Sequence, residues 1–374
     1  MGVFPSVRPL PYVPPHLQGD AVRLRALLST AVILLGSHVL ASAAEPQWQR
    51  VHLGQGAGYD FPVYANHRLD GDLRGIREVV FIQHGLRRNG DSYYAAGEAL
   101  LKASGRPPAE VLLVAPNFPG RADGQRFPDM PHWTTDGWIA GEDAVSGISV
   151  PLSSLQVLDD LVAFVTDRAR LPRVREVVVA GHSAGAQIVH RYAVLNNVDE
   201  RIRASGVTLR YVVANPSSYL YFTPVRPVAP DYERFAPYDT AVCANYDRYR
   251  YGVQDMVPYA RGADGMALYT RYMGRQVTYM VGSADNDPNH RLLDKSCGAE
   301  AEGPTRLMRA RAYMRYERLL AAPGEVIGHE AFEVEGVGHD QSRMFGSQCG
   351  ARALFGTDPG ADSRGAACVP AGGG

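Results

Sequence analysis

The sequence feature that most constrains the fold is a series of short apolar runs separated by helical patterns. The runs lie at 78–82, 111–114, 177–180, 211–214, 277–281 and 331–334. In most of them the apolar residues are consecutive, which is typical of strands buried on both faces of a parallel sheet. We therefore predict an α/β fold with a mainly parallel central sheet flanked by helices.

Three segments between these runs predict helices. An apolar helical stripe is formed by Leu155, Leu158, Leu161, Val162 and Val165. Ser153 and Gln156 have the spacing of a capping box at the start of this helix. Two further helices are predicted over 186–195 and 304–320. The segment 48–66, with a Gly-rich turn at 54–58, predicts an antiparallel hairpin at the edge of the sheet.

Two segments, 117–147 and 217–274, are longer than ordinary loops. Structureless insertions of this length are usually lids or binding loops, so we expect a cap or rim over a cleft. The first contains Trp133 and Trp138, and the second contains Tyr219 in a Tyr-rich stretch. These aromatic residues either pack an irregular cap or form a rim for an organic substrate.

The N-terminal region has the order of a secretory signal. Arg23 and Arg25 precede the apolar run 26–41, and a small-residue cleavage pattern follows at 41–43. The run is short for a membrane span, which needs about 20 residues. We predict a cleaved signal peptide at 1–43, with an uncleaved anchor as the alternative. The folded domain is then expected over 44–355, followed by a loose tail at 356–374.

Composition limits the partners. The 374 residues contain 38 Lys+Arg and 39 Asp+Glu, a formal net charge of −1. Nucleic acids and anionic membranes select basic proteins, so neither is expected as the main partner. No stretch after the leader is apolar enough to span a bilayer, and the oligomeric state is not indicated.

The four cysteines, Cys243, Cys297, Cys349 and Cys368, are an even number in a chain expected to be exported. Such cysteines form disulfides in an oxidising compartment. Three pairings are possible. We favour 243–297 with 349–368, because the second pair would tie down the Gly-rich tail.

The motif at 181–185, Gly-His-Ser-Ala-Gly, lies between a predicted buried strand and a predicted helix. A tight strand-to-helix turn presents Ser183 clear of the sheet and near the positive end of a helix. Glycines on both sides avoid Cβ clashes in this turn. Ser183 is therefore the candidate nucleophile.

A serine hydroxyl needs a base and an acid that orients it. His339 follows the last predicted strand, and its ordinary pKa suits a general base. Asp285 ends the preceding strand and is the expected acid, with Asp287 as the alternative. Asp340 is too close to His339 in sequence to reach around to it.

With these residues in the order Ser183, Asp285, His339, the chain resembles the α/β-hydrolase superfamily over nearly the whole mature sequence. The segment 83–90 begins Gln-His-Gly-Leu, and a His-Gly at this place contributes to the oxyanion hole in that superfamily. The resemblance implies backbone N–H donors from Leu86 and Ala184, and a structural role for His84. The His-Gly at 84–85 followed by Ser-Tyr-Tyr at 92–94 also resembles the corresponding stretch of secreted polyester depolymerases and feruloyl esterases, without placing a subfamily.

We therefore expect a secreted or periplasmic serine hydrolase that cleaves a small-molecule or polymeric carboxylic ester. An amidase or peptidase with the same triad is one alternative. A catalytically inactive binding protein on the same fold is another. No Cys/His spacing indicates zinc and no glycine-rich phosphate loop follows a strand, so neither a metal nor a cofactor is expected.

Overall fold

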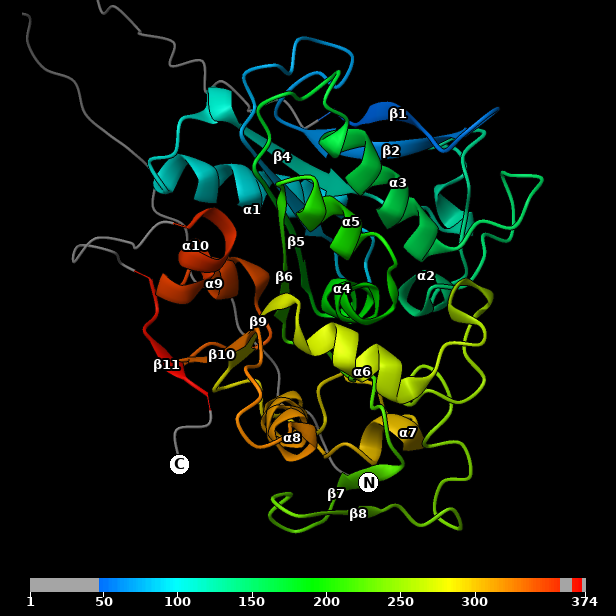
Figure 1. Cartoon of the computed structure of the whole chain (residues 1–374), viewed down its shortest axis with the longest axis vertical. Coiled ribbons are helices and arrows are strands. Elements are labelled where there is room, and N and C mark those ends of the chain that lie inside the picture. The colour runs from blue at the N-terminus through cyan, green and yellow to red at the C-terminus, as the bar shows by residue number, and fades with distance from the viewer. Residues whose placement is uncertain (1–46, 357–364, 372–374) are drawn as a thin grey trace, which may run out of the picture. The chain divides into compact units, whose positions relative to one another are not determined.

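The computed structural model describes residues 47–356 and 365–371. The predicted signal peptide at 1–43 lies outside the described residues. A nine-stranded sheet runs through the described part in the order β1-β2-β4-β3-β5-β6-β9-β10-β11 (Figure 1). The strands are β1 (Gln49–Leu53), β2 (Tyr59–Ala65), β3 (Glu78–Gln83), β4 (Val111–Pro116), β5 (Glu176–His182), β6 (Thr208–Ala214), β9 (Gln276–Gly282), β10 (His329–Val334) and β11 (Cys368–Pro370).

The six strands from β4 to β10 in this order are parallel, and each of them contains one of the six predicted runs. The outer strands β1, β2 and β11 pair antiparallel with their neighbours. The predicted hairpin at 48–66 is formed by β1 and β2. The sheet is therefore mainly parallel, as predicted.

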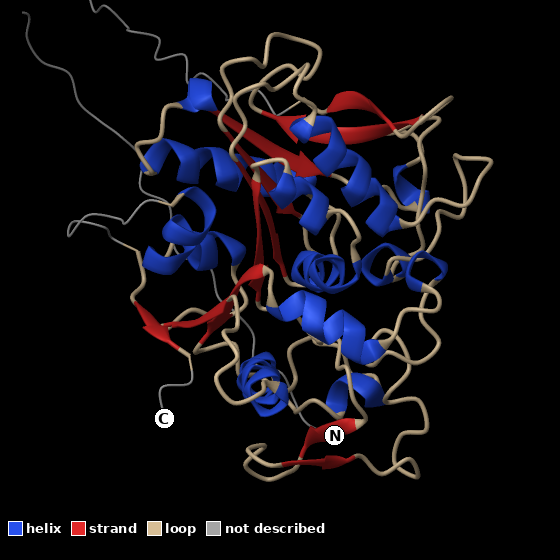
Figure 2. Ribbon diagram, viewed as in Figure 1, coloured by secondary structure: helices blue, strands red, loops and turns tan. Residues whose placement is uncertain are grey.

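Helices cover both faces of this sheet, as Figure 2 shows. They are α1 (Gly90–Ala103), α2 (Gly137–Ala140), α3 (Ser154–Thr166), α4 (Ala184–Leu195), α5 (Asp199–Ala204), α6 (Gly265–Met273), α7 (Cys297–Glu300), α8 (Arg306–Leu320), α9 (Gln341–Phe345) and α10 (Gln348–Phe355). Short 3₁₀ helices lie at Pro108–Glu110, Arg121–Asp123 and Pro258–Ala260.

The side chains of each central strand divide between two cores, because successive residues of a strand point to opposite faces. Val79 and Phe81 of β3 pack in the core formed with α3, α4, α6 and α8. Val80 and Ile82 pack on the other face with α1, α9 and α10. Figure 1 shows α1, α9 and α10 on one side of the sheet and α3, α4 and α6 on the other. Burial on both faces explains why these strands are continuously apolar.

The predicted capping box is only half formed. Ser153 Oγ accepts a hydrogen bond from the Leu155 N–H at 3.1 Å, as an N-cap should. Gln156 instead donates from Nε2 to Asp160 Oδ1 at 3.0 Å, one turn further along α3. The long side chain finds a partner on its own helix face and does not return to the N-cap.

The insertion at 217–274 is less irregular than expected. It contains α6 and the two-stranded sheet of β7 (Val225–Pro227) and β8 (Phe235–Pro237). Leu268, Tyr269 and Tyr272 of α6 are buried in the main core. The insertion is thus partly a structural layer, because its apolar residues cover the sheet.

The tail predicted to be loose is ordered over 365–371. Cys368 bonds to Cys349 of α10, and β11 pairs with β10. The physical reason is that β10 would otherwise present unpaired backbone groups at the sheet edge. The second disulfide joins Cys243 to Cys297. These are the two pairs that the sequence favours.

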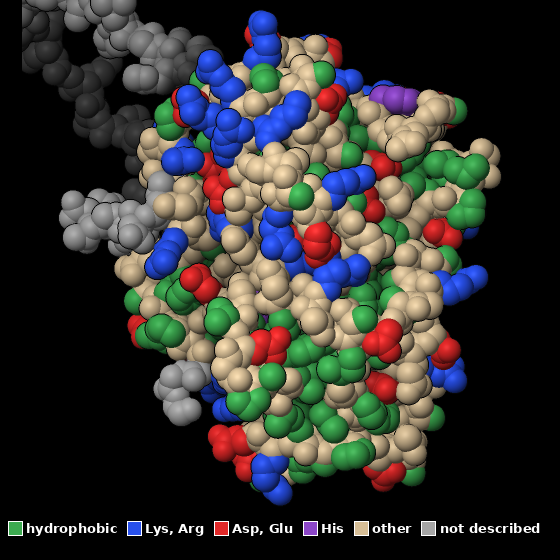
Figure 3. Space-filling model, in the orientation of Figure 1, with side chains coloured by type: hydrophobic (Ala, Val, Ile, Leu, Met, Phe, Trp, Pro, Cys, Tyr) green, Lys and Arg blue, Asp and Glu red, His purple; other side chains and the backbone are tan. Residues whose placement is uncertain are grey.

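Charge is unevenly distributed over the surface. Figure 3 shows Lys and Arg side chains gathered over α1 and β4. Arg77 and Arg175 directly precede β3 and β5, at the N-terminal ends of these parallel strands. The near-zero total charge therefore does not describe each region of the molecule.

Candidate active site

Ser183 lies in a strained turn between β5 and α4. Its backbone has φ 61° and ψ −123°, a conformation that L residues rarely adopt. The Ser183 N–H donates to the Ala214 carbonyl at 2.9 Å, which fixes the turn to the neighbouring strand β6. The hydroxyl therefore stands at the N-terminus of α4, where the helix dipole is positive.

The glycines of the motif are required by close backbone contacts. A Cβ at Gly181 would lie 2.2 Å from the Gly185 carbonyl oxygen. A Cβ at Gly185 would lie 2.4 Å from the carbonyl oxygen of Gln83, at the end of β3. Both contacts are shorter than real Cβ contacts, so the tight turn is accessible only to glycine at these positions.

Two further side chains meet Ser183 at the C-terminal edge of the sheet. Ser183 Oγ donates to His339 Nε2 at 2.9 Å, and His339 Nδ1 donates to Asp285 Oδ2 at 2.8 Å. His339 follows β10 and Asp285 follows β9, so adjacent parallel strands bring them together. Asp287 is exposed and accepts the Asn289 N–H at 2.8 Å. The geometry thus connects His339 to Asp285, and the alternative acid lies outside this hydrogen-bonded chain.

A buried arginine adjoins the carboxylate. Arg306, the first residue of α8, places its guanidinium 3.2 Å from Asp285 Oδ1. It also donates to the Leu292 carbonyl at 2.6 Å and to Ser217 Oγ at 3.0 Å. Asp285 therefore has a partner on each oxygen, which fixes the plane of the carboxylate.

These contacts shift the pKa values of Asp285 and His339. Burial opposes ionisation of Asp285, but the hydrogen bond from His339 and the Arg306 charge outweigh it and hold the pKa of Asp285 below its usual value. Burial and the Arg306 charge lower the pKa of His339, although the Asp285 hydrogen bond opposes them. His339 is therefore neutral at neutral pH, with its Nε2 lone pair directed at Ser183.

Leu86 and Ala184, the predicted oxyanion donors, lie close to Ser183. Both residues line the cavity beside Ser183, and Ala184 is the first residue of α4. Among the described residues, neither N–H donates to a backbone carbonyl in a turn, loop or cap. His84 holds the Leu86 loop in place, because its Nδ1 donates to the Gly85 carbonyl at 2.8 Å and its Nε2 accepts the Phe118 N–H at 3.0 Å. Burial lowers the pKa of His84 to about 3, so it is a neutral structural residue.

Comparison with known families agrees with this architecture. A family model described as "Alpha/beta hydrolase family" matches residues 79–350, which is most of the chain. The chain belongs to the alpha/beta hydrolase family. The matched range contains Ser183, Asp285 and His339, and it confirms the fold predicted from the sequence.

Solved structures resemble this hydrolase in fold. LpqC, a poly(3-hydroxybutyrate) depolymerase from Bordetella parapertussis, is 22% identical with a TM-score of 0.57, over 84% of this chain and 92% of that one. Poly(aspartic acid) hydrolase-1 from Sphingomonas sp. KT-1 is 20% identical with a TM-score of 0.57, over 83% and 99%. The search of curated proteins finds no match. At these identities the likeness concerns the fold alone.

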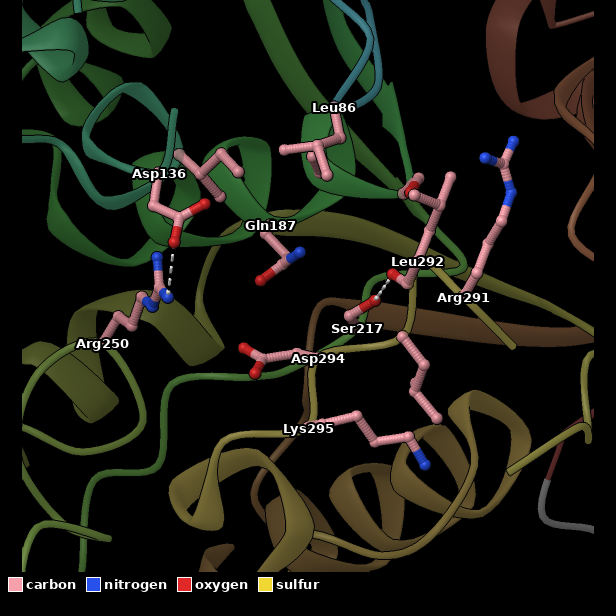
Figure 4. Close-up of a pocket in the computed structure, with 13 residues that line it drawn as sticks. Leu86, Asp136, Gln187, Ser217, Arg250, Arg291, Leu292, Asp294 and Lys295 are labelled. Atoms are coloured by element: carbon pink, nitrogen blue, oxygen red, sulfur yellow. Dashed lines mark hydrogen bonds and ion pairs between the residues drawn. The ribbon is translucent and has the colours of Figure 1, made fainter. Parts of the chain in front are cut away.

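Two cavities of this hydrolase meet at Ser183. The first, in Figure 4, is lined by Leu86, Asp136, Ile139, Ser183, Ala184, Gln187, Ser217, Arg250, Arg291, Leu292, Leu293, Asp294 and Lys295. The second includes Arg87, His182, His339 and Gln341. Asp136 and Arg250 come from the two long insertions, which therefore contribute to the rim as expected.

The aromatic residues expected at this rim are instead buried. Trp133 and Trp138 are 1% and 0% exposed, and Trp138 stacks on Phe118 at 5.6 Å between ring centroids. Tyr219 is 1% exposed and stacks on Tyr313 at 4.4 Å. None of the three lines either cavity. The substrate-rim prediction was wrong for them, because large aromatic side chains bury more apolar surface in the core than a polar cleft offers.

Sequence reasoning missed Gln187, Arg250 and Arg306. Gln187 stands four residues after Ser183, a spacing that places it on the same face of α4, so this residue could have been found. Its Oε1 accepts a hydrogen bond from Ser218 Oγ at 2.9 Å, so the Nε2 group of the same amide points away from Ser218. Arg250 and Arg306 carry no local signal, because only the folded chain brings Arg250 to the cleft and Arg306 to the buried carboxylate of Asp285.

Other kinds of site receive no support in the described part of the chain. No cluster of three or more His, Cys, Asp or Glu side chains there is arranged to hold a metal ion. None of the described helices combines the length and the apolar character needed to cross a membrane.

Proposed function

We propose that this protein is a secreted serine hydrolase that cleaves carboxylic esters through an acyl-enzyme intermediate. The observation that carries the proposal is the unbroken hydrogen-bonded chain from Ser183 Oγ through His339 to Asp285. The two disulfides and the predicted leader support an oxidising compartment outside the cytoplasm.

The acylation step follows from the geometry. His339 Nε2 takes the Ser183 proton while Oγ forms a bond to the ester carbonyl carbon. The carbonyl oxygen becomes an oxyanion, which the N–H groups of Leu86 and Ala184 stabilise. Asp285 stabilises the imidazolium. His339 then donates the same proton to the alcohol oxygen as the ester C–O bond breaks and the alcohol leaves.

Deacylation repeats these roles with water. His339 takes a proton from a water molecule while the water oxygen attacks the acyl carbon. His339 then donates that proton to Ser183 Oγ as the acyl–serine bond breaks, which releases the acid and restores the enzyme.

The test is replacement of the nucleophile. Ser183→Ala is expected to lower kcat for p-nitrophenyl acetate about 10⁶-fold, since a triad serine acts as part of one unit. The matched control is Ser205→Ala, which removes an exposed hydroxyl at the end of α5 and should retain full activity. A fluorophosphonate probe should label the wild type and the control, and should not label Ser183→Ala.

Normal turnover by Ser183→Ala would disprove this mechanism. Failure of the wild-type protein both to turn over esters and to bind the probe would favour a binding protein on a hydrolase fold. A panel of acyl esters of graded length, a polyester film and matched anilides then defines the acyl group and the preference for esters over amides.

A further inference from the structure

The two cavities at Ser183 have different chemical roles, if the proposed function holds. His339 donates its proton to the departing alcohol, so the alcohol must lie on the His339 side. The cavity that contains His339 and Gln341 is therefore the leaving-group side. The cavity that contains Ala184, Gln187 and Arg250 is the acyl side.

Charges on the acyl side are mixed, because the carboxylates Asp136 and Asp294 line it together with Arg250, Lys295 and Arg291, the last of which lines both cavities. Arg250 is 3.4 Å from the carboxylate of Asp136. Asp294 accepts hydrogen bonds from Tyr251 Oη at 2.8 Å and from Ser296 Oγ at 2.8 Å. Figure 4 shows Asp136 and Arg250 facing each other across one end of this cavity. An anionic acyl group would therefore meet two carboxylates on this side as well as cations.

The leaving-group side differs, because the permanently charged side chains that line it are both positive. Arg87 and Arg291 line this cavity, and no Asp or Glu lines it. Neither arginine forms an ion pair with another described residue. The cavity therefore presents two guanidinium groups to a ligand.

The acids nearest to this cavity in sequence are engaged in their own turns. Asp340 Oδ1 accepts the Arg343 N–H at 2.9 Å as the N-cap of α9. Asp287 Oδ1 accepts the Asn289 N–H at 2.8 Å. Neither of them lines the cavity, although Asp340 and Asp287 lie near enough to act electrostatically on Tyr93 and His290, which do line it.

The two arginines come from separate walls. Arg87 directly follows Leu86 in the turn after β3, next to the predicted oxyanion donor. Arg291 belongs to the loop between β9 and α7, and Figure 4 shows it on the opposite side of the first cavity from Arg250. Asn89, the N-cap of α1, also lines the leaving-group side, so the positive end of that helix dipole adds to the field.

We propose that the substrate is an ester whose alcohol portion carries a carboxylate, which Arg87 and Arg291 recognise. Guanidinium groups bind carboxylates through charge-assisted hydrogen bonds. Such an alcohol is what the carboxyl-terminal unit of any hydroxy-acid oligoester presents at its last ester bond. The inference rests on the proposed function and adds the substrate class of the same site.

The experiment compares two acetate esters that differ only in charge on the leaving group. These are 4-carboxyphenyl acetate and 4-carbamoylphenyl acetate, and the measured quantity is the ratio of their kcat/KM values. Each arginine is expected to contribute up to about fivefold to this ratio, as exposed charge pairs do. Arg87→Gln and Arg291→Gln should each lower the ratio, and the double variant should lower it about 10-fold.

Three controls make the comparison specific. Arg173→Gln removes an exposed arginine that precedes β5, whereas Ser183 follows β5. The two ends of this strand are about 20 Å apart, so the ratio of kcat/KM values should not change. Raising salt from about 20 mM to about 500 mM should reduce the wild-type ratio, since screening weakens exposed ion pairs. Mono-4-nitrophenyl succinate carries its carboxylate on the acyl side, so it should respond less than 4-carboxyphenyl acetate to Arg87→Gln, because Arg87 lines only the leaving-group side.

The outcomes separate the two proposals. If the neutral ester is hydrolysed and Ser183 is labelled, but the double variant leaves the ratio unchanged, the recognition of an anionic alcohol is overturned and the hydrolase stands. If neither ester is hydrolysed and Ser183 is not labelled, both proposals are overturned. A ratio that falls in both arginine variants and with salt supports the inference.

Discussion

At the scale of single residues, Asp285 is held by two partners at once, His339 on one carboxylate oxygen and Arg306 on the other. Asp285→Asn is expected to lower kcat about 10⁴-fold, because the amide favours the wrong imidazole tautomer. The comparison is Asp287→Asn, an exposed residue outside the hydrogen-bonded chain, which should change kcat little. Steady-state kinetics with p-nitrophenyl acetate measures both. A large loss only in Asp287→Asn would reassign the acid.

The pH dependence of activity follows from the pKa of His339. The neutral imidazole accepts the Ser183 proton, so kcat/KM falls as pH decreases through the pKa of His339. Burial and the Arg306 charge lower this pKa below 6.5, so half of the maximal kcat/KM should be reached below pH 6.5. A profile of kcat/KM from about pH 4.5 to about pH 8 measures this midpoint.

Replacing Arg306 should move the midpoint in a known direction. Arg306→Gln removes a buried positive charge, which raises the pKa of His339 and shifts the midpoint to higher pH. Arg311→Gln is the matched control on the same helix, because its guanidinium pairs with Glu333 at 2.7 Å, outside the site. An unmoved midpoint in Arg306→Gln would contradict the electrostatic role of this arginine.

At the scale of elements, the turn between β5 and α4 depends on the absence of side chains at its two glycines. Gly181→Ala places a Cβ 2.2 Å from the Gly185 carbonyl oxygen, so the backbone must shift. We expect a loss of about 1–3 kcal/mol in the free energy of unfolding, together with a lower kcat. Urea denaturation and p-nitrophenyl acetate kinetics measure the two effects.

The control for this prediction is Gly124→Ala. Gly124 has right-handed helical backbone angles, and an added Cβ would make only ordinary contacts, the nearest at 3.6 Å. It should leave stability and kcat nearly unchanged. Equal effects of the two substitutions would show that the contact at Gly181 does not determine the turn.

At the scale of the whole folded part, two disulfides connect segments far apart in sequence. Cys349–Cys368 joins residues 19 apart and Cys243–Cys297 joins residues 54 apart. Loop-closure entropy predicts losses of about 3 and about 4 kcal/mol when each pair is replaced by serines. Guanidinium denaturation of the two double variants measures these losses.

The two disulfide variants should differ in activity as well. Cys297 lies two residues after Lys295, which lines the acyl-side cavity. Cys368 instead lies on the edge strand β11 and Cys349 on α10. Loss of Cys243–Cys297 should therefore raise KM, and loss of Cys349–Cys368 should leave it unchanged. Identical KM values in the two variants would show that the first disulfide does not support the cavity wall.

The sequence by itself determined the parallel sheet, because strands buried on both faces must be continuously apolar. It also determined the place of Ser183, since the glycines at 181 and 185 reflect contacts within one local turn. Asp285 and His339 could be chosen because parallel strands end at a common edge. These features depend on local pattern or on topology that local pattern implies.

Only the tertiary structure decided which side chains face the cleft. Trp133, Trp138 and Tyr219 are of the aromatic type expected at a binding rim, but they are buried. Burying their apolar area in the core stabilises the fold more than placing it at a polar cleft would. Arg306 reaches Asp285 across 21 residues of sequence, and Arg87 and Arg291 line one cavity from separate loops. Such contacts depend on how loops pack in three dimensions, and no periodicity or motif in the chain encodes them.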